Sequence, residues 1–161
     1  MKPVFDLPES HVPALAAMLQ RLPPAEYRWA LTGSGGLRLQ GVDVPVHDLD
    51  VQTDEATLRR MEAALADCMT TRVHCWETPG MRSLDGKAML EGVEVELLAN
   101  IAHRLPDGSW STTTDFSRLL WLGWHGLRVA VFPLADELAA YEAMGRTAKA
   151  DLIRKFLDAR K

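Results

Sequence analysis

Two stretches of the sequence decide the fold: Trp29-Ala-Leu-Thr-Gly-Ser-Gly-Gly-Leu37 and Val46-His-Asp-Leu-Asp-Val-Gln-Thr53. The first predicts an apolar strand that enters a glycine-rich turn and then a helix. The second predicts a strand on which Asp48 and Asp50 leave the same face, because side chains two residues apart do so. Thirteen residues separate Ser34 from Asp48. Together they predict a place where phosphate groups lie against a turn while a divalent cation sits between two acids.

The periodicity of the flanking sequence predicts helices and strands in a mixed order. The predicted helices are one capped by Ser10 that runs to Leu22, a short one at 37–39, one at 55–69, and two after Pro133 that Gly145 separates. The predicted strands are 27–32, 46–53, 72–77, 87–90, 93–98, 116–122 and 127–132. This order favours an α/β (α+β) fold, a mixed β-sheet flanked by helices with two helices at the C-terminus, over a doubly wound parallel fold.

Length and composition place the chain among ordinary globular proteins. A chain of 161 residues predicts one domain, 1–161, and the 47% hydrophobic and 25% charged residues are typical values. The formal net charge of -4 argues against an extended nucleic-acid interface. No apolar run approaches the roughly 20 residues of a membrane span, and the first nine residues carry acids and prolines rather than a signal-peptide core. We therefore expect a cytoplasmic protein.

A further pair of acids follows on the strand predicted at 93–98. Glu94 and Glu96 share one face of it, and either could complete a metal cluster beside Asp48 and Asp50. Glu96 is preferred, because the apolar residues after it suggest a central strand. Three acids can hold Mg²⁺ (or Mn²⁺) ions that clamp an in-line displacement, and one acid can accept the proton of the attacking hydroxyl. The alternative is a half-exposed strand whose acids are solvated.

Several residues could bind phosphate. Gly33 lets a phosphate approach the backbone, and Ser34 adds a hydroxyl donor. Arg38 follows the turn closely, while Arg146 and Lys149 share a face near the C-terminus. For all three cations, a solvated basic surface is the alternative.

The segment from Leu31 to Val51 resembles the signature of the DNA polymerase β-like nucleotidyltransferase superfamily: a hydrophobic residue, Gly, Gly or Ser, a spacer, then acid-hydrophobic-acid. Here the signature is Leu31-Thr-Gly-Ser34 and Asp48-Leu-Asp50, with an extra Thr32 and a glutamate as third acid. The resemblance implies a mixed-sheet nucleotidyltransferase core and Mg²⁺-dependent transfer of a nucleoside monophosphate from an NTP to a hydroxyl. By position, Gly33 and Ser34 would hold the triphosphate, and Asp48 and Asp50 the metal.

The leading hypothesis is thus a small stand-alone nucleotidyltransferase that uses an NTP, ATP in the first instance, and an acceptor hydroxyl on a small molecule, RNA or protein. One alternative is a non-catalytic nucleotide-binding or toxin-antitoxin type partner protein with the same fold. Another is a metal-dependent phosphohydrolase. Among the tryptophans, Trp121 is predicted to pack in the core, and Trp124 is predicted to be exposed in a turn where it could contact a base.

Overall fold

A computed structural model describes residues 6–161; Met1–Phe5, part of the N-terminal stretch considered above, lie outside the described residues. Seven strands form one mixed sheet in the order β3-β4-β5-β2-β1-β7-β6. The strands are β1 (Trp29–Thr32), β2 (Leu49–Thr53), β3 (Met69–Glu77), β4 (Met81–Leu90), β5 (Val93–His103), β6 (Leu120–Trp124) and β7 (Leu127–Val131). The helices are η1 (Glu9–His11), α1 (Val12–Arg21), α2 (Gly33–Leu39), α3 (Glu55–Ala64), α4 (Leu134–Ala143) and α5 (Thr147–Asp158).

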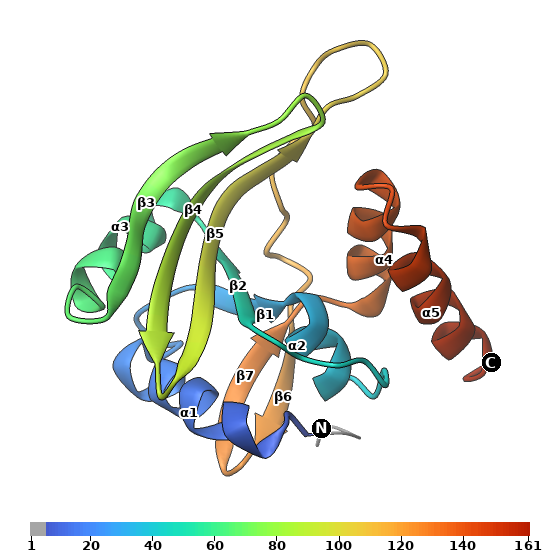
Figure 1. Cartoon of the computed structure of the whole chain (residues 1–161). Helices are drawn as coiled ribbons and strands as arrows, with labels where there is room; N and C mark the ends of the chain where they lie inside the picture. The colour runs from blue at the N-terminus through green and yellow to red at the C-terminus, as the bar shows by residue number, and fades with distance from the viewer. Residues whose placement is uncertain (1–5) are drawn as a thin grey trace.

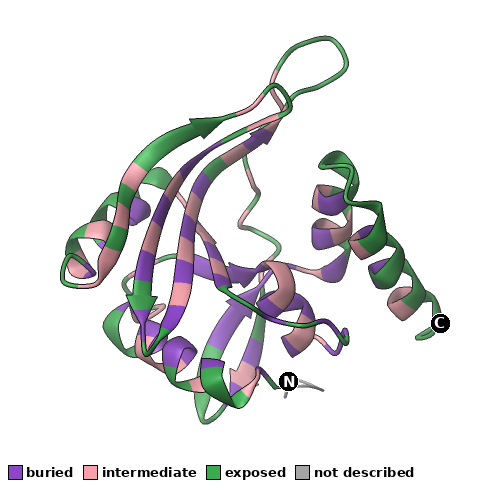
Figure 2. Ribbon diagram, in the orientation of Figure 1, coloured by how far each residue is buried: buried purple, intermediate pink, exposed green. Residues whose placement is uncertain are grey.

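The helices divide between the two sides of the sheet (Figure 1). Helices α1 and α3 pack on one side, where their apolar residues join Leu49, Val51, Val95 and Leu97 in the main core. Helices α4 and α5 pair with each other and share a smaller cluster with Leu37 of α2. Burial alternates along β2 and β5 (Figure 2), so one face of each strand packs in the main core; the other carries Asp50 and Gln52 on β2, and Glu94, Glu96, Leu98 and Ile101 on β5. That opposite face is available for a site.

The centre of the sheet places residues of three strands side by side. Strand β2 pairs antiparallel with β1 and parallel with β5, with Asp50 opposite both Thr32 and Glu96. Strand β5 continues antiparallel into β4 through the hairpin predicted at Glu91-Gly92, and this register sets Lys87 opposite Glu96. The strands β3, β4 and β5 are long and curved, and the segment 104–119 extends beyond their tips before the chain returns to β6 (Figure 1).

The local structure differs from the prediction at both halves of the motif. The predicted turn at 33–36 is already helical, because α2 begins at Gly33 and anchors itself through the buried Leu37 and Leu39. The predicted strand 46–53 is shorter, since β2 begins at Leu49. Asp48 therefore lies at a bend ahead of the strand, and of the two aspartates only Asp50 is a residue of β2.

The N-cap of α1 and the burial of two tryptophans also differ from the prediction. Ser10 does not cap α1: its hydroxyl bonds His11 Nδ1, and the helix has no side-chain cap. Trp124 is the last residue of β6, only 2% exposed, with Nε1 donating to Asp6. Trp121 points away from that core and is 41% exposed on this edge strand, so the two predicted environments are reversed. Within residues 6–161, no helix combines the length and the apolar character that a bilayer span needs.

Candidate active site

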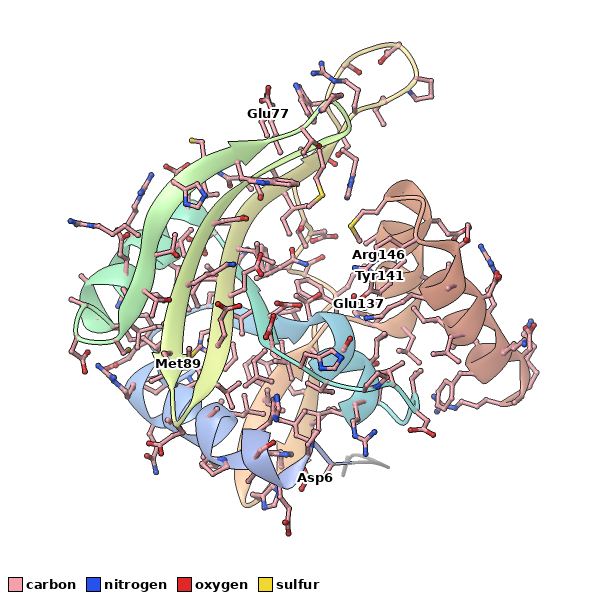
Figure 3. All side chains as sticks on the ribbon, in the orientation of Figure 1. Asp6, Glu77, Met89, Glu137, Tyr141 and Arg146 are labelled. Atoms are coloured by element: carbon pink, nitrogen blue, oxygen red, sulfur yellow. The ribbon has the colours of Figure 1, made fainter. Side chains whose placement is uncertain are left out.

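A cavity of about 940 Å³ lies between the polar face of the sheet and helix α4. Its floor is formed by residues of the central strands, and its sides come from α4 and from the segment 104–119. Of the predicted residues, Gly33, Asp50, Glu96 and Arg146 line it. Figure 3 shows that Arg146 and two residues of α4, Glu137 and Tyr141, come from the C-terminal helical pair on its side toward the sheet.

Asp50 and Glu96 are neighbours on the cavity floor. They occupy facing positions of the parallel β2–β5 ladder, where adjacent strands lie about 4.8 Å apart. Glu94 is two residues earlier on β5, and its carboxylate lies 4.0 Å from Lys87 Nζ. The strand register therefore places Glu96, and not Glu94, opposite Asp50. Glu96 is the glutamate preferred from the sequence.

The two acids on the cavity floor, Asp50 and Glu96, have raised pKa values. Burial raises the pKa of Asp50 to about 6, with further increases from the charges of Asp48 and Glu94. Burial likewise raises the pKa of Glu96 to about 7, followed in effect by the charges of Asp50 and Asp85. Lys149 and Arg146 act in the opposite direction on Asp50. The cavity floor is thus a concentration of negative charge with cations from the C-terminal helices beside it.

The expected convergence of three acids on one ion is not seen. Within the part of the chain that the structure describes, no three His, Cys, Asp or Glu side chains are grouped so as to hold a metal ion. Asp48 lies at a bend before β2, and within the described residues Asp50 and Glu96 are the acids that face each other across the β2–β5 ladder. The donor set still fits Mg²⁺, because Asp48 and Asp50 offer hard oxygen ligands and Mg²⁺ takes much of its coordination shell from water and substrate phosphates.

The turn at Gly33 is tightly fitted against Asp50. Gly33 has φ +64°, and a Cβ on this residue would lie 2.7 Å from Asp50 Oδ2. A side chain at this position would therefore meet both backbone strain and the carboxylate. The Gly33 backbone N–H donates to the Glu137 carboxylate. This amide, which the sequence suggested for the triphosphate, is thus occupied from within the protein.

Two cations from the C-terminal helices approach the same turn. Lys149 Nζ donates to Ser34 Oγ at 2.5 Å. The Lys149 ammonium and the Arg146 guanidinium each lie 5.4 Å from the centre of the Tyr141 ring. Burial lowers the pKa of Lys149, and the charge of Arg146 lowers it further. Ser34, Lys149 and Arg146 are thereby brought together, as a phosphate-binding group requires.

Arg38 is not part of this group. Its Nε donates to the Asp6 carbonyl at 2.7 Å, and its Nη1 donates to the Val44 carbonyl at 3.2 Å. Like Ser34 and Lys149, it is absent from the lining of the cavity. Its guanidinium holds the N-terminal segment and the loop before β2, and a role of Arg38 in binding phosphate stays a prediction.

Two parts of the site had no signal in the sequence. Glu137 is 5% exposed and accepts a hydrogen bond from the Thr32 hydroxyl. Gln52 lines the same cavity, donates to the Thr32 hydroxyl at 3.4 Å and accepts a 2.7 Å hydrogen bond from Thr114. Glu137 looked like an ordinary acid in the first turn of a helix, and Gln52 like a polar residue of a half-exposed strand. Only tertiary folding brings Glu137 to a residue 105 positions away.

The chain is similar in fold to solved structures of known proteins. A putative nucleotidyltransferase from Thermotoga maritima is 31% identical in sequence, with a TM-score of 0.84 over 97% of this chain and 98% of that one. The lincomycin-bound lincosamide antibiotic adenylyltransferase LnuA is 10% identical, with a TM-score of 0.56 over 92% and 98% of the two chains, which shows a shared fold. A search of curated proteins found no match.

The family itself is shown by a match over most of the chain. The family described as aminoglycoside-2''-adenylyltransferase matches residues 14–154, a range that contains the glycine turn, all the acids of the site, and Lys149. This match and the Thermotoga maritima structure confirm the predicted nucleotidyltransferase superfamily and the mixed-sheet fold. The chain belongs to the aminoglycoside-2''-adenylyltransferase family of nucleotidyltransferases.

Proposed function

We propose that this protein transfers a nucleoside monophosphate from an NTP to a hydroxyl of a small acceptor, with ATP as the donor and Mg²⁺ (or Mn²⁺) as the metal. One observation carries the proposal: Asp50 and Glu96 face each other on a cavity floor beside the Gly33 turn, where Lys149 reaches Ser34. The family description supports an adenylyl group as the one transferred.

The triphosphate is assigned to the group formed by Ser34, Lys149 and Arg146. Lys149 and Arg146 supply positive charge, and Ser34 supplies a hydroxyl, which together suit the oxygens of a phosphate chain. The anionic floor at Asp50 would repel the same phosphates without a cation between them. Asp48 and Asp50 would hold that cation, which supplies charge neutralisation and orientation for phosphoryl chemistry.

Glu96 is assigned as the group that accepts the acceptor's proton. It lines the cavity next to Asp50, where an acceptor hydroxyl would approach the α-phosphorus. In the transfer, the acceptor oxygen forms a bond to the α-phosphorus, the bond from that phosphorus to the bridging oxygen breaks, and pyrophosphate leaves. The hydroxyl proton passes to the Glu96 carboxylate.

The cavity favours a small acceptor that carries hydroxyl and amino groups. Its volume of about 940 Å³ is that of a small-molecule site. Asp85 lines it and offers a carboxylate, while Thr112 and Thr113 offer hydroxyls. A protonated amine suits Asp85, and the name of the family refers to an aminoglycoside. We therefore favour a small cationic acceptor over RNA or protein.

Calorimetry and a pyrophosphate-release assay test this proposal. We expect wild-type protein to bind a non-hydrolysable ATP analogue with Mg²⁺, and to release pyrophosphate with at least one hydroxylated amine from a panel. Asp50→Asn should lower turnover by at least about a hundredfold while the fold is retained. Asp43→Asn is the matched control, because Asp43 is exposed and lies on the loop before β2.

Each alternative has a distinct outcome in the same assays. Binding without turnover on any acceptor would favour a nucleotide-binding partner protein. Release of inorganic phosphate without an acceptor would favour a phosphohydrolase. Equal turnover in Asp50→Asn and Asp43→Asn would contradict the proposed mechanism.

A further inference from the structure

Glu137 is a buried carboxylate at the edge of the cavity that the chemistry proposed above does not use. It lies in the first turn of α4 and is 5% exposed. Burying a carboxylate is costly unless hydrogen bonds compensate, so such a residue requires an explanation. Its two donors both come from the start of the glycine turn: the Thr32 hydroxyl and the Gly33 backbone N–H. Helix α4 therefore holds the turn through one side chain.

The same hydroxyl connects Glu137 to the opposite side of the cavity. Thr32 Oγ1 donates to Glu137 and lies 3.4 Å from Gln52 Nε2, which donates to it. Gln52 Oε1 in turn accepts from Thr114 Oγ1 at 2.7 Å. These four side chains, the Thr32 network, link α4, β1, β2 and the segment 104–119. Every member lines the cavity, so the network forms part of its wall rather than of the core.

The position of the turn decides the geometry of the groups assigned to the nucleotide. A Cβ built on Gly33 would lie only 2.7 Å from Asp50 Oδ2, so the backbone of the turn is close to that carboxylate. A small displacement of Gly33 would therefore change the distance between them. Ser34, the next residue, bonds Lys149 at 2.5 Å. A group that holds the Gly33 amide therefore limits how far the turn, with Ser34, can move relative to Asp50.

We infer that Glu137 is a positioning residue for the nucleotide: from α4, through Thr32 and the Gly33 amide, it holds the turn that places Ser34 against Asp50. This inference rests on the proposed function, because it assigns Glu137 a part in binding the NTP. In this inference the two C-terminal helices have separate roles. Helix α4 supplies the carboxylate that orients the turn, and α5 with its N-cap supplies the cations Arg146 and Lys149.

Nucleotide affinity of three variants tests the inference. The probe is a non-hydrolysable ATP analogue with Mg²⁺, measured by calorimetry and referred to the folded fraction of each protein. Glu137→Ala leaves both donors unpaired, and we expect a Kd increase of about tenfold or more. Glu137→Gln keeps an acceptor oxygen, and the Thr32 hydroxyl can rotate to accept from the new amide, so its Kd should stay within about threefold of wild type. Glu142→Ala, an exposed α4 acid paired with Arg154, should bind as wild type does.

The outcomes separate this inference from the proposed function. Wild-type protein that fails to bind the analogue overturns both. If the wild type binds the analogue and Glu137→Ala binds it with the same Kd, the positioning role alone is overturned. The same conclusion holds if Glu137→Ala loses thermal stability but keeps its affinity. Tighter binding by Glu137→Ala also overturns it, because the carboxylate would then compete with phosphate for the turn. Equal weakening in Glu137→Gln and Glu137→Ala would also overturn it, because a variant that keeps an acceptor oxygen would then bind no better than one without it.

Discussion

Replacing Gly33 with alanine separates backbone strain from damage to the site. At φ +64° an alanine adopts the left-handed region, which costs about 1–2 kcal/mol. Its Cβ would lie 2.7 Å from Asp50 Oδ2, whereas an ordinary contact begins at 3.4 Å, so the carboxylate oxygen must move by about 0.7 Å. A misplacement of about 1 Å in an active site can lower turnover by roughly a hundredfold. We expect Gly33→Ala to lose about 1–2 kcal/mol of stability and between about tenfold and a hundredfold of turnover.

Gly92 provides a matched control. It also has a left-handed backbone, with φ +77°, but a Cβ there has no atom within 4 Å. Gly92→Ala should therefore show a similar loss of stability in urea denaturation and keep wild-type turnover per folded molecule. Pyrophosphate release and affinity for the ATP analogue, measured on both variants, check the difference. If Gly33→Ala retains the turnover of Gly92→Ala, the contact between the turn and Asp50 has no part in the chemistry.

Two further predictions concern charge. Lys149→Met removes the ammonium that bonds Ser34, so the Kd for the ATP analogue should rise by about tenfold. Lys155 is exposed on α5, and Lys155→Met should leave the Kd unchanged. Equal effects of the two substitutions would exclude a specific role for Lys149. Burial raises the pKa of Glu137 from 4.5 to about 7, so the folded state binds this proton more tightly than the unfolded state does. The free energy of unfolding should therefore fall as the pH rises from about 4.5 to about 7. At about 1.4 kcal/mol per pH unit this is at most about 3.5 kcal/mol, and Glu137→Gln should recover it at pH 8 but not at pH 4 in urea denaturation. A pH-independent difference between the two proteins would contradict this linkage.

The parts of the fold that could be predicted are those encoded by neighbouring residues. The Glu91-Gly92 hairpin follows from turn chemistry, since both residues adopt positive φ. Alternation along β2 and β5 indicated which face carries Asp50 and Glu96. The glycine turn followed by acid-hydrophobic-acid is likewise a local pattern, and it led to the superfamily that the comparisons confirm.

What could not be predicted depends on contacts between distant segments. Helix α2 begins at Gly33 although glycine is a poor helix former, because tertiary burial of Leu37 and Leu39 outweighs propensity. The hydrogen bonds from the Arg38 guanidinium to the Asp6 and Val44 carbonyls likewise depend on the folded chain, and no local pattern indicates them. The role inferred for Glu137 depends on a contact with Thr32 across more than half the chain, and no local pattern reports it.

The division of the site along the chain has a consequence for synthesis on the ribosome. The acids Asp48, Asp50 and Glu96 are all translated before Arg146 and Lys149, the cations that partly offset the charge of Asp50. A nascent chain that has completed only the sheet carries this anionic face without those cations. If the proposed function is right, the emerging domain should acquire affinity for nucleotide only after α5 leaves the exit tunnel, and a product that stalls before α5 should bind the ATP analogue more weakly than the folded protein does.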